Sequence, residues 1–332
     1  MPSAPTRPSA PLEVRLADDA PAVLAVEEPD DPADWAFTHR EALRATVTEH
    51  GAVVVRGLGI ADAAGFAPVA RALAGGELMT EVEAFAPRSA VDGVYTATPW
   101  PAHEQMCQHH ELSYLRTPPG LMMFACTVAP ADGGATPVAS AADVLADLPA
   151  ALVDRFEREG WRLERSYTDE VGASWADAFG TADRAAVEAY CTAQGIEFAW
   201  QSGGGLTTSQ LRPAVVTHPV TGRRGWVNQI AFLSEWILDE DVREFFLDEY
   251  DARPFTTRHA DGTPVAEEDV ATINEVYARH TRRLPWEGGD LLLVDNLSTS
   301  HGREPFSGPR EVLAALAEPV VVDDSHELRR HS

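Results

Sequence analysis

The sequence predicts a mainly β protein with flanking helices. Short β-branched or apolar runs recur along the chain and end at glycine, proline or polar residues, which is typical of strands. Helical stretches lie between some of these runs without regular alternation, so a series of βαβ units is not expected. No glycine-rich phosphate loop follows a strand, which argues against a nucleotide-binding α/β fold. The 332 residues, 45% of them hydrophobic, are enough to enclose a large core.

The N-terminal part is expected to hold a tail, two helices and several strands. Residues 1–12 are rich in proline, serine and alanine and lack the apolar stretch of a secretory signal, so we expect a disordered tail. Helical apolar spacing predicts helices over 34–50 and 65–77, the second closed by glycines. Strands are predicted over 51–60, 92–100 and 106–115, with a buried strand over 120–130.

The rest of the chain continues this mixture. Residues 132–140 are expected to form a turn and a short extended piece, followed by one helix over 141–160. The region from 161 to 226 is mixed and predicts no clear order. Helices are expected over 239–252 and 267–283, the last two strands over 289–304 and 310–322, and a short tail over 326–332.

Composition limits the possible partners and surroundings. The formal net charge is −26, and all 26 basic residues are arginine. A surface this acidic repels phosphate backbones and anionic lipid, so nucleic-acid binding is not expected. No run of about 18 apolar residues predicts a membrane span. Three cysteines without a paired spacing suggest a reducing, cytoplasmic setting.

The stretch "MCQHHELSYL", residues 106–115, places polar side chains inside an otherwise apolar strand-like run. Burying such groups costs free energy unless something satisfies them. In a strand, residues two apart share a face, so Cys107, His109 and Glu111 point one way and His110 points the other. One imidazole and one carboxylate are two-thirds of the 2-His-1-carboxylate triad that binds non-haem Fe(II).

The second imidazole has to come from elsewhere in the chain. His301 is the best candidate, because a buried apolar strand there runs into an Asp-Asn pair and then this histidine. His218 lies beside a turn, and the other histidines lie in polar or helical surroundings. On these residues alone, a metal site and ordinary hydrogen-bonded histidines both stay open.

Three blocks in order resemble the TauD/TfdA family of Fe(II)/2-oxoglutarate-dependent dioxygenases. They are "HHELSY", "DGGATPVAS" and "GDLLLVDNLSTSHGREPFSGPREVLAALAE", with further matches in "APRSAVDGVYTATPWP" and "GWVNQIAF". The likeness runs from about Gly51 to Pro319. It is strongest to the clavaminate-synthase-like and SyrP-like amino-acid hydroxylases, which carry H-x-E. The resemblance implies a double-stranded β-helix, or jelly roll of the cupin-like kind, forming a single domain over 13–325 with iron at its mouth.

The resemblance also assigns roles at the site. His109, Glu111 and His301 would bind Fe(II), with 2-oxoglutarate and O₂ as cosubstrates. Arg310 would hold the distal carboxylate of 2-oxoglutarate, for which a two-pronged guanidinium is suited, and Thr136 would assist it. Without the surrounding blocks, Arg310 and Thr136 would be read as ordinary turn residues.

The family implies a small amino-acid-like substrate in specialised metabolism such as antibiotic biosynthesis, free or tethered to a carrier protein. A carboxylate at Glu111 favours hydroxylation over halogenation. Asn228, Arg88 and Arg303 are the candidate substrate contacts, although Asn228 equally suits a strand tie and either arginine a structural ion pair. A lid-like insertion is expected around 161–215.

Two other functions use the same residues. A zinc hydrolase would explain His109, Glu111 and His301 but leaves Arg310 and Thr136 without a role. A non-catalytic jelly-roll binding protein would not need all three ligands to be intact.

Overall fold

The structure, a computed structural model, describes residues 12–85, 90–168, 172–250 and 252–322. The predicted tails over residues 1–11 and 326–332 lie outside the described residues, and so does Arg88. Leu12, the last residue of the predicted N-terminal tail, donates its amide to Thr46 Oγ1 at 2.8 Å. Within the described ranges, no helix combines the length and apolarity needed to cross a membrane.

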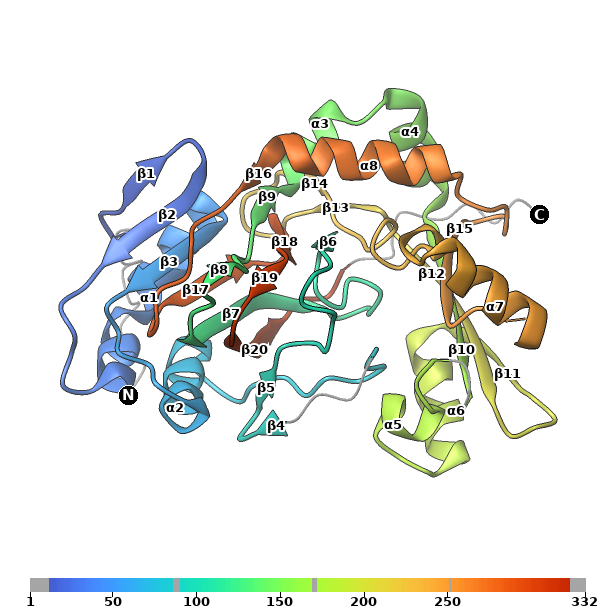
Figure 1. Ribbon diagram of the computed structural model, residues 1–332, viewed down its shortest axis with the longest axis horizontal. Coiled ribbons are helices and arrows are strands. Elements are labelled where there is room, and N and C mark those ends of the chain that lie inside the picture. The colour runs from blue at the N-terminus through green and yellow to red at the C-terminus, as the bar shows by residue number, and fades with distance from the viewer. Residues whose placement is uncertain (1–11, 86–89, 169–171, 251, 323–332) are drawn as a thin grey trace, which may run out of the picture.

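The larger sheet has eight strands and extends from the edge of the molecule at β1 and β2 toward its middle at β7 and β20 (Figure 1). Its strands run in the order β1 (Arg15–Ala17), β2 (Ala20–Ala25), β3 (Ala52–Arg56), β17 (Leu291–Asp295), β7 (Pro119–Val128), β20 (Glu311–Pro319), β5 (Val94–Thr96) and β4 (Ala90–Val91). Neighbours are antiparallel except for the parallel pair β2 and β3. The strands predicted over 51–60, 92–100 and 120–130 correspond to β3, β5 and β7, and the helices predicted over 34–50 and 65–77 are present at Pro32–His50 and Ala63–Ala74.

The two faces of this sheet build two separate cores. Val53 and Val55 of β3 pack toward α1 (Pro32–His50) and α2 (Ala63–Ala74), whereas Val54 between them belongs to the inner core. The period-two alternation of a strand produces this division. Helix α1 begins where the Asp31 side chain accepts two backbone amides and ends at Gly51, whose φ of 78° suits glycine.

A smaller sheet faces the inner side of the larger one. Its strands run in the order β16 (Thr281–Arg282), β9 (Val138–Ser140), β18 (Thr299–Arg303) and β6 (Met106–His109). The His301 ring of β18 lies 4.9 Å from the Phe124 ring of β7, so the sheets meet there. Helices α3 (Ala141–Asp147) and α8 (Glu267–His280) cover the outer side. The two facing sheets form the predicted jelly roll with flanking helices.

The predicted strand over 289–304 is in fact two strands in different sheets. Asp295, at the end of β17, accepts the backbone amides of Leu297 at 3.2 Å and Ser298 at 3.3 Å. Such an aspartate turn reverses the chain. The turn moves the chain from the larger sheet to the smaller one, and this move brings His301 of β18 opposite β6.

The predicted helix over 141–160 is also divided, into α3 and α4 (Ala150–Glu159). Leu148 and Pro149 between them have extended backbone conformations. Proline disfavours a helical conformation in the residue before it, so the helix stops and restarts.

The region from 161 to 226, which the sequence left unordered, contains its own small sheet. We call residues 161–212 the insertion unit. It comprises β10 (Trp161–Tyr167), α5 (Trp175–Phe179), α6 (Arg184–Gln194), β11 (Ile196–Trp200) and β12 (Leu206–Arg212). The later strand β15 (Phe255–His259) completes the sheet, in the order β11-β12-β10-β15. Figure 1 shows this unit on the opposite side of the molecule from α1 and α2. That it acts as a lid stays a prediction.

Short elements connect these layers. They are the hairpin of β13 (Val215–Thr217) and β14 (Arg224–Trp226), the pair β8 (Asp132–Gly133) and β19 (Phe306–Ser307), the 3-10 turn η1 (Glu235–Ile237) and α7 (Glu240–Tyr250).

Candidate metal centre

Three of the predicted residues converge between the two sheets. His109 and His301 are direct partners across β6 and β18, so their side chains leave the sheet side by side. Glu111 Oε2 lies 3.6 Å from His109 Nε2 and 3.4 Å from His301 Nε2. All three ligand atoms lie within 4.8 Å of one another. Both imidazoles are buried, and the Glu111 side chain is 12% exposed.

Glu111 reaches this point from a turn, which corrects the strand predicted over 106–115. Strand β6 ends at His109, and residues 111–114 form a turn in which Leu112 has a φ of 50°. Neither backbone group of Glu111 bonds to a neighbouring strand. The carboxylate therefore meets the imidazoles through the turn geometry, and the period-two argument reached the right pair for the wrong reason.

The side chain of Asn296 holds that turn, a role that was not predicted from the sequence. Its Oδ1 accepts the Glu111 amide at 2.8 Å, and its Nδ2 donates to the Glu111 carbonyl at 2.9 Å. Nδ2 also donates to the Pro119 carbonyl at 2.9 Å, and Asn296 is fully buried. The position of Asn296 directly after a buried strand was the one sequence signal for this role. The sequence could not show that its partner would be Glu111, 185 residues away.

The orientation of His109 suits a metal ligand. Its Nδ1 lies 2.9 Å from the Cys107 carbonyl oxygen. Because a carbonyl only accepts, Nδ1 carries the hydrogen, and the Nε2 lone pair faces Glu111 and His301. The Phe232 ring stacks on the His109 ring, with centroids 4.1 Å apart and planes 11° from parallel. The imidazole is therefore held from its edge and from its face.

The donor set fits iron. In an octahedral site, bonds of about 2.1 Å at right angles separate neighbouring donor atoms by about 3 Å. The measured separations of 3.4 and 3.6 Å approach that spacing. Two imidazoles and one carboxylate on one side form the facial arrangement that non-haem Fe(II) oxygenases use, which leaves the other positions for substrates.

His110 is kept out of this group, as predicted. It is fully buried, and its Nδ1 donates to the Asn296 carbonyl at 2.6 Å. Burial lowers the pKa of His110 to about 4, so the ring is neutral at physiological pH. It supports the site by packing beside Asn296.

Arg310 and Thr136 come together, and Thr136 lies two residues before Val138, the register partner of His301. Arg310 Nη2 donates to Thr136 Oγ1 at 3.4 Å, and its Nε donates to the Gly134 carbonyl at 2.9 Å. Burial and the nearby Arg303 lower the pKa of Arg310 to about 10. Within the described part of the chain, Arg310 makes no ion pair with a carboxylate. A half-buried cation without an acidic partner is unusual in a chain of net charge −26.

Two of the predicted substrate contacts are occupied by backbone groups. The Asn228 amide donates to the Ala214 carbonyl and accepts from the Ile230 amide, each at 3.0 Å. This is the strand tie that the sequence left as an alternative. Arg303 donates to three carbonyls in the loop before β6, those of Trp100, Pro101 and Glu104. Arg303 therefore holds that loop, and Arg88 lies outside the described residues.

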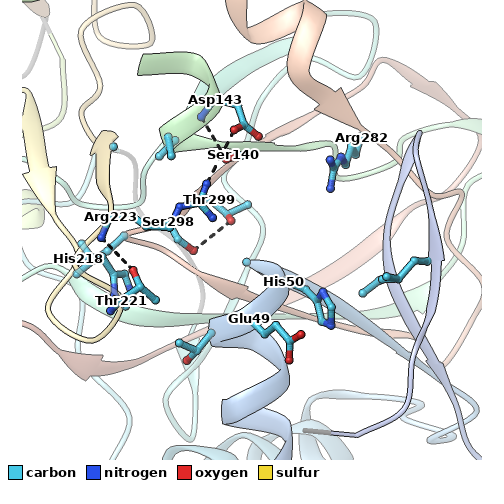
Figure 2. A pocket seen from close by; sticks show the side chains of 18 of the residues that line it. Glu49, His50, Ser140, Asp143, His218, Thr221, Arg223, Arg282, Ser298 and Thr299 are labelled. Atoms are coloured by element: carbon cyan, nitrogen blue, oxygen red, sulfur yellow. Dashed lines mark hydrogen bonds and ion pairs between the residues drawn. The ribbon is translucent and has the colours of Figure 1, made fainter. Parts of the chain in front are cut away.

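A separate polar cavity of about 540 Å³ lies at the start of β18 (Figure 2). The hydroxyls of Ser298 and Thr299 line its floor, and Arg223, Arg282 and His50 stand around it. None of the triad residues lines this cavity, and neither does Arg310. This cavity is therefore separate from the triad.

Residues 18–316 match the family model of the taurine catabolism dioxygenase TauD, TfdA family. The chain belongs to the TauD/TfdA family. A member of this family is a dioxygenase that uses iron and 2-oxoglutarate, and the His-Glu-His group described above is consistent with that class. Family membership favours the dioxygenase over the zinc hydrolase and the non-catalytic binding protein.

Individual relatives agree over nearly their whole length. The dapdiamide synthesis protein DdaC of Enterobacter agglomerans is 32% identical over 309 residues, covering 92% of this chain and 94% of DdaC. A clavaminate synthase-like protein of Arabidopsis thaliana is 30% identical, covering 85% of this chain and 86% of its own. The crystal structure of PvcB from Pseudomonas aeruginosa has a TM-score of 0.51 at 18% identity, covering 96% and 94% of the two chains. This last likeness supports the jelly-roll fold.

Proposed function

We propose that this dioxygenase hydroxylates an unactivated C–H bond of a small amino-acid-like substrate, free or tethered to a carrier protein. In this proposal, His109, Glu111 and His301 hold Fe(II), and Arg310 with Thr136 holds the distal carboxylate of 2-oxoglutarate. The observation that carries it is the half-buried Arg310, which has no carboxylate partner among the described residues and lies beside a 2-His-1-carboxylate group.

The position of Arg310 suits the length of 2-oxoglutarate. Phe124 and Cys126 share the inner face of β7, about 6.6 Å apart. Phe124 contacts the ring of His301, and Cys126 lies close enough to Arg310 for their charges to interact. One cosubstrate molecule could therefore span the distance between the triad and the guanidinium. A bidentate pair with a carboxylate would then supply the partner that Arg310 lacks.

The relatives support the class of substrate. DdaC is named for dapdiamide synthesis, and another relative is clavaminate synthase-like. PvcB is described as an Fe, alpha-ketoglutarate dependent oxygenase from an isonitrile synthetic pathway. These names point to specialised metabolism of amino-acid-derived compounds, and we extend that class to this chain.

The residues of the chain have separate tasks in the reaction. When bound, iron would activate O₂ as the oxidant, with two electrons coming from the oxidative decarboxylation of 2-oxoglutarate to succinate and CO₂ and two from the substrate C–H bond. Asn296 fixes the backbone of Glu111, and Cys107 and Phe232 orient the His109 ring. The buried aromatic surroundings of the triad, Phe124 and Phe232, exclude water from the reacting carbon.

The deciding experiment is anaerobic addition of Fe(II) and 2-oxoglutarate to metal-free protein. We expect a weak visible metal-to-ligand charge-transfer band. His109→Ala should abolish the band because one imidazole is lost, and Arg310→Ala should weaken 2-oxoglutarate binding about 10- to 100-fold. Arg223→Ala is the matched control, because this arginine is 65% exposed and lies at the separate cavity.

Absence of the band in the wild type would contradict the proposal. Activity restored by Zn(II) in chelator-stripped protein would then favour a hydrolase, and an iron-independent stoichiometric ligand would favour a binding protein. If the band forms, amino acids offered free and loaded on carrier domains are compared for stimulated succinate formation. That comparison identifies the form in which the substrate arrives.

A further inference from the structure

A short segment after α2 connects the jelly roll to the insertion unit. Near its start, the Met79 amide donates to the Leu316 carbonyl of β20 at 2.8 Å. Near its end, the Ala84 amide donates to the Ala178 carbonyl of α5 at 3.1 Å. Figure 1 shows the chain crossing from α2 toward α5 and α6. This segment therefore contacts both β20 of the jelly roll and α5 of the insertion unit.

Glu83 lies at the centre of the segment and is held from both sides. Its side chain accepts the Tyr190 hydroxyl of α6 at 2.9 Å. Its carbonyl accepts from Arg165 of β10 at 2.6 Å and from the Tyr114 hydroxyl at 3.0 Å. Glu83 is 1% exposed and has a φ of 59°. A buried glutamate in a left-handed conformation costs free energy, and the surrounding contacts offset that cost.

Arg165 shares the task of holding this segment. Its second guanidinium nitrogen donates to the Ala84 carbonyl at 2.9 Å. The guanidinium also lies over the rings of Phe85 and Tyr167, at 4.4 and 4.7 Å from their centroids. The arginine is only 4% exposed, so these contacts act in a low-dielectric interior. The segment is therefore pinned to β10 at two consecutive carbonyls.

Tyr114 links Glu83 to the metal centre. It is three residues after Glu111 and belongs to the same turn. Its hydroxyl donates to Glu83, and its carbonyl accepts from Arg212 Nε at 2.6 Å and from Gln210 Nε2 at 3.4 Å. Both of these donors lie on β12 of the insertion unit. The turn that carries Glu111 is thus held by the insertion unit at the Tyr114 carbonyl and by the Glu83 backbone at the Tyr114 hydroxyl.

We propose that Glu83 is a positioning residue for Glu111, and that it transmits the position of the insertion unit to the metal centre through Tyr114. The inference rests on the ligand role proposed for Glu111. The path runs from Tyr190 and Arg165 to Glu83, then to the Tyr114 hydroxyl, and along the turn to the carboxylate. Asn296 fixes the other side of the same turn. The two contacts together hold the backbone of the turn from which the Glu111 carboxylate projects.

The test measures Fe(II) affinity and the charge-transfer band in full-length variants, with thermal stability recorded alongside. Tyr114→Phe removes only the hydroxyl that reaches Glu83. We expect it to weaken Fe(II) binding about tenfold and to shift the band, because the loss of a residue that orients a metal ligand typically lowers metal affinity by about this factor. Glu83→Ala leaves the backbone carbonyl of Glu83 in place but removes the carboxylate that Tyr190 anchors, so the carbonyl is held less firmly and a loss of similar size is expected. Glu83→Gln keeps an acceptor oxygen for Tyr190 and should stay within about threefold of wild type.

Two comparisons separate a positioning role from a structural one. Glu164→Gln is the matched control: Glu164 lies on the outer face of β10 in an ion pair with Arg258 at 2.6 Å and should leave affinity and band unchanged. Because Glu83 and Tyr114 act on one path, the double variant of Glu83→Ala and Tyr114→Phe should bind iron about as weakly as either single variant.

Two results would overturn the inference. In one, Tyr114→Phe lowers thermal stability while the affinity and band stay as in wild type. In the other, the two substitutions multiply to about a hundredfold loss, which shows independent effects. If Glu83→Ala fails to fold, Tyr114→Phe and Glu83→Gln still decide. A wild type without the band would contradict the proposed function instead, so the two failures are distinguishable.

Discussion

At the scale of single residues, the metal centre depends on buried side chains that hydrogen-bond to the backbone around it. The side-chain amide of Asn296 bonds to both backbone groups of Glu111. The side-chain amide of Asn228 bonds to the Ala214 carbonyl and the Ile230 amide. The two asparagines have the same chemistry and similar burial. They differ in whether the backbone they hold carries a metal ligand.

Asn296→Asp should therefore damage both stability and iron binding. The new carboxylate would face the carbonyl oxygens of Glu111 and Pro119 and lose both donations, at a cost of about 1–3 kcal/mol or more. Iron affinity should fall about 10- to 100-fold because Glu111 is released. Asn228→Asp is the matched control and should lower stability alone. Equal effects of both variants on iron affinity, measured by titration, would contradict the role given to Asn296.

His110 predicts a pH dependence of stability. Its pKa is about 4 in the folded protein against an ordinary value of 6.5, because burial disfavours the charged ring. Between these values the unfolded chain binds the proton and the folded chain does not, so stability rises with pH across this window and is lost on acidification. The free energy of unfolding, measured with urea at pH values above and below this window, should change less with pH in His110→Asn than in the wild type. The difference should reach up to about 3 kcal/mol. An unchanged slope would refute this assignment.

At the scale of elements, turns place the functional groups. The aspartate turn between β17 and β18 carries the chain from one sheet to the other and brings His301 opposite His109. The turn between β8 and β9 likewise positions Arg310, which donates to a carbonyl of that turn. Gly134 lies there with a φ of 69°, and its carbonyl accepts from Arg310 Nε at 2.9 Å.

Gly134→Ala should displace Arg310. An added β-carbon would lie 2.9 Å from Phe306 Cβ and 3.2 Å from Arg310 Cδ, and the positive φ disfavours alanine. We expect 2-oxoglutarate binding to weaken while Fe(II) binding is retained. Gly222→Ala is the control, because Gly222 has the same φ of 69° and nothing within 4 Å of the added carbon. Titration of the charge-transfer band with 2-oxoglutarate measures its affinity in both variants. An equal loss of 2-oxoglutarate affinity in Gly134→Ala and Gly222→Ala would contradict the steric argument.

At the scale of the whole molecule, the metal centre joins segments that are far apart in the chain. His109 and Glu111 are followed by Thr136, and then by His301 and Arg310 after more than a hundred further residues. The two sheets meet at this centre, and the larger sheet buries a core on each face. Ligands that bind there connect the layers of the fold and bind the folded state alone.

Fe(II) and 2-oxoglutarate together should therefore stabilise the protein. At a free ligand concentration of about 100 times Kd, binding adds about 2.7 kcal/mol to the free energy of unfolding. We expect anaerobic thermal denaturation to show a midpoint raised by a few degrees, which a chelator reverses. Glu111→Ala should fold but show no such rise. A rise of equal size in that variant would locate the metal elsewhere.

Much of the architecture was readable from the sequence. Helices over 34–50 and 65–77 and the buried strand over 120–130 were predicted, because apolar spacing is a local signal. The split of 289–304 was missed, because the Asp295 turn interrupts a run that looks continuous. The insertion unit was missed, because β15 completes its sheet from far along the chain.

The sequence by itself determined the chemistry available to this protein: two histidines and a glutamate at family spacing, an arginine nine residues after the last histidine, and a jelly roll to hold them. Only the tertiary structure decided how they are positioned. The contacts of Asn296 with Glu111, of Arg310 with Thr136 and of Glu83 with Tyr190 all join residues that the chain separates widely. Such contacts are specified by packing across the two sheets, which no local pattern of residues encodes.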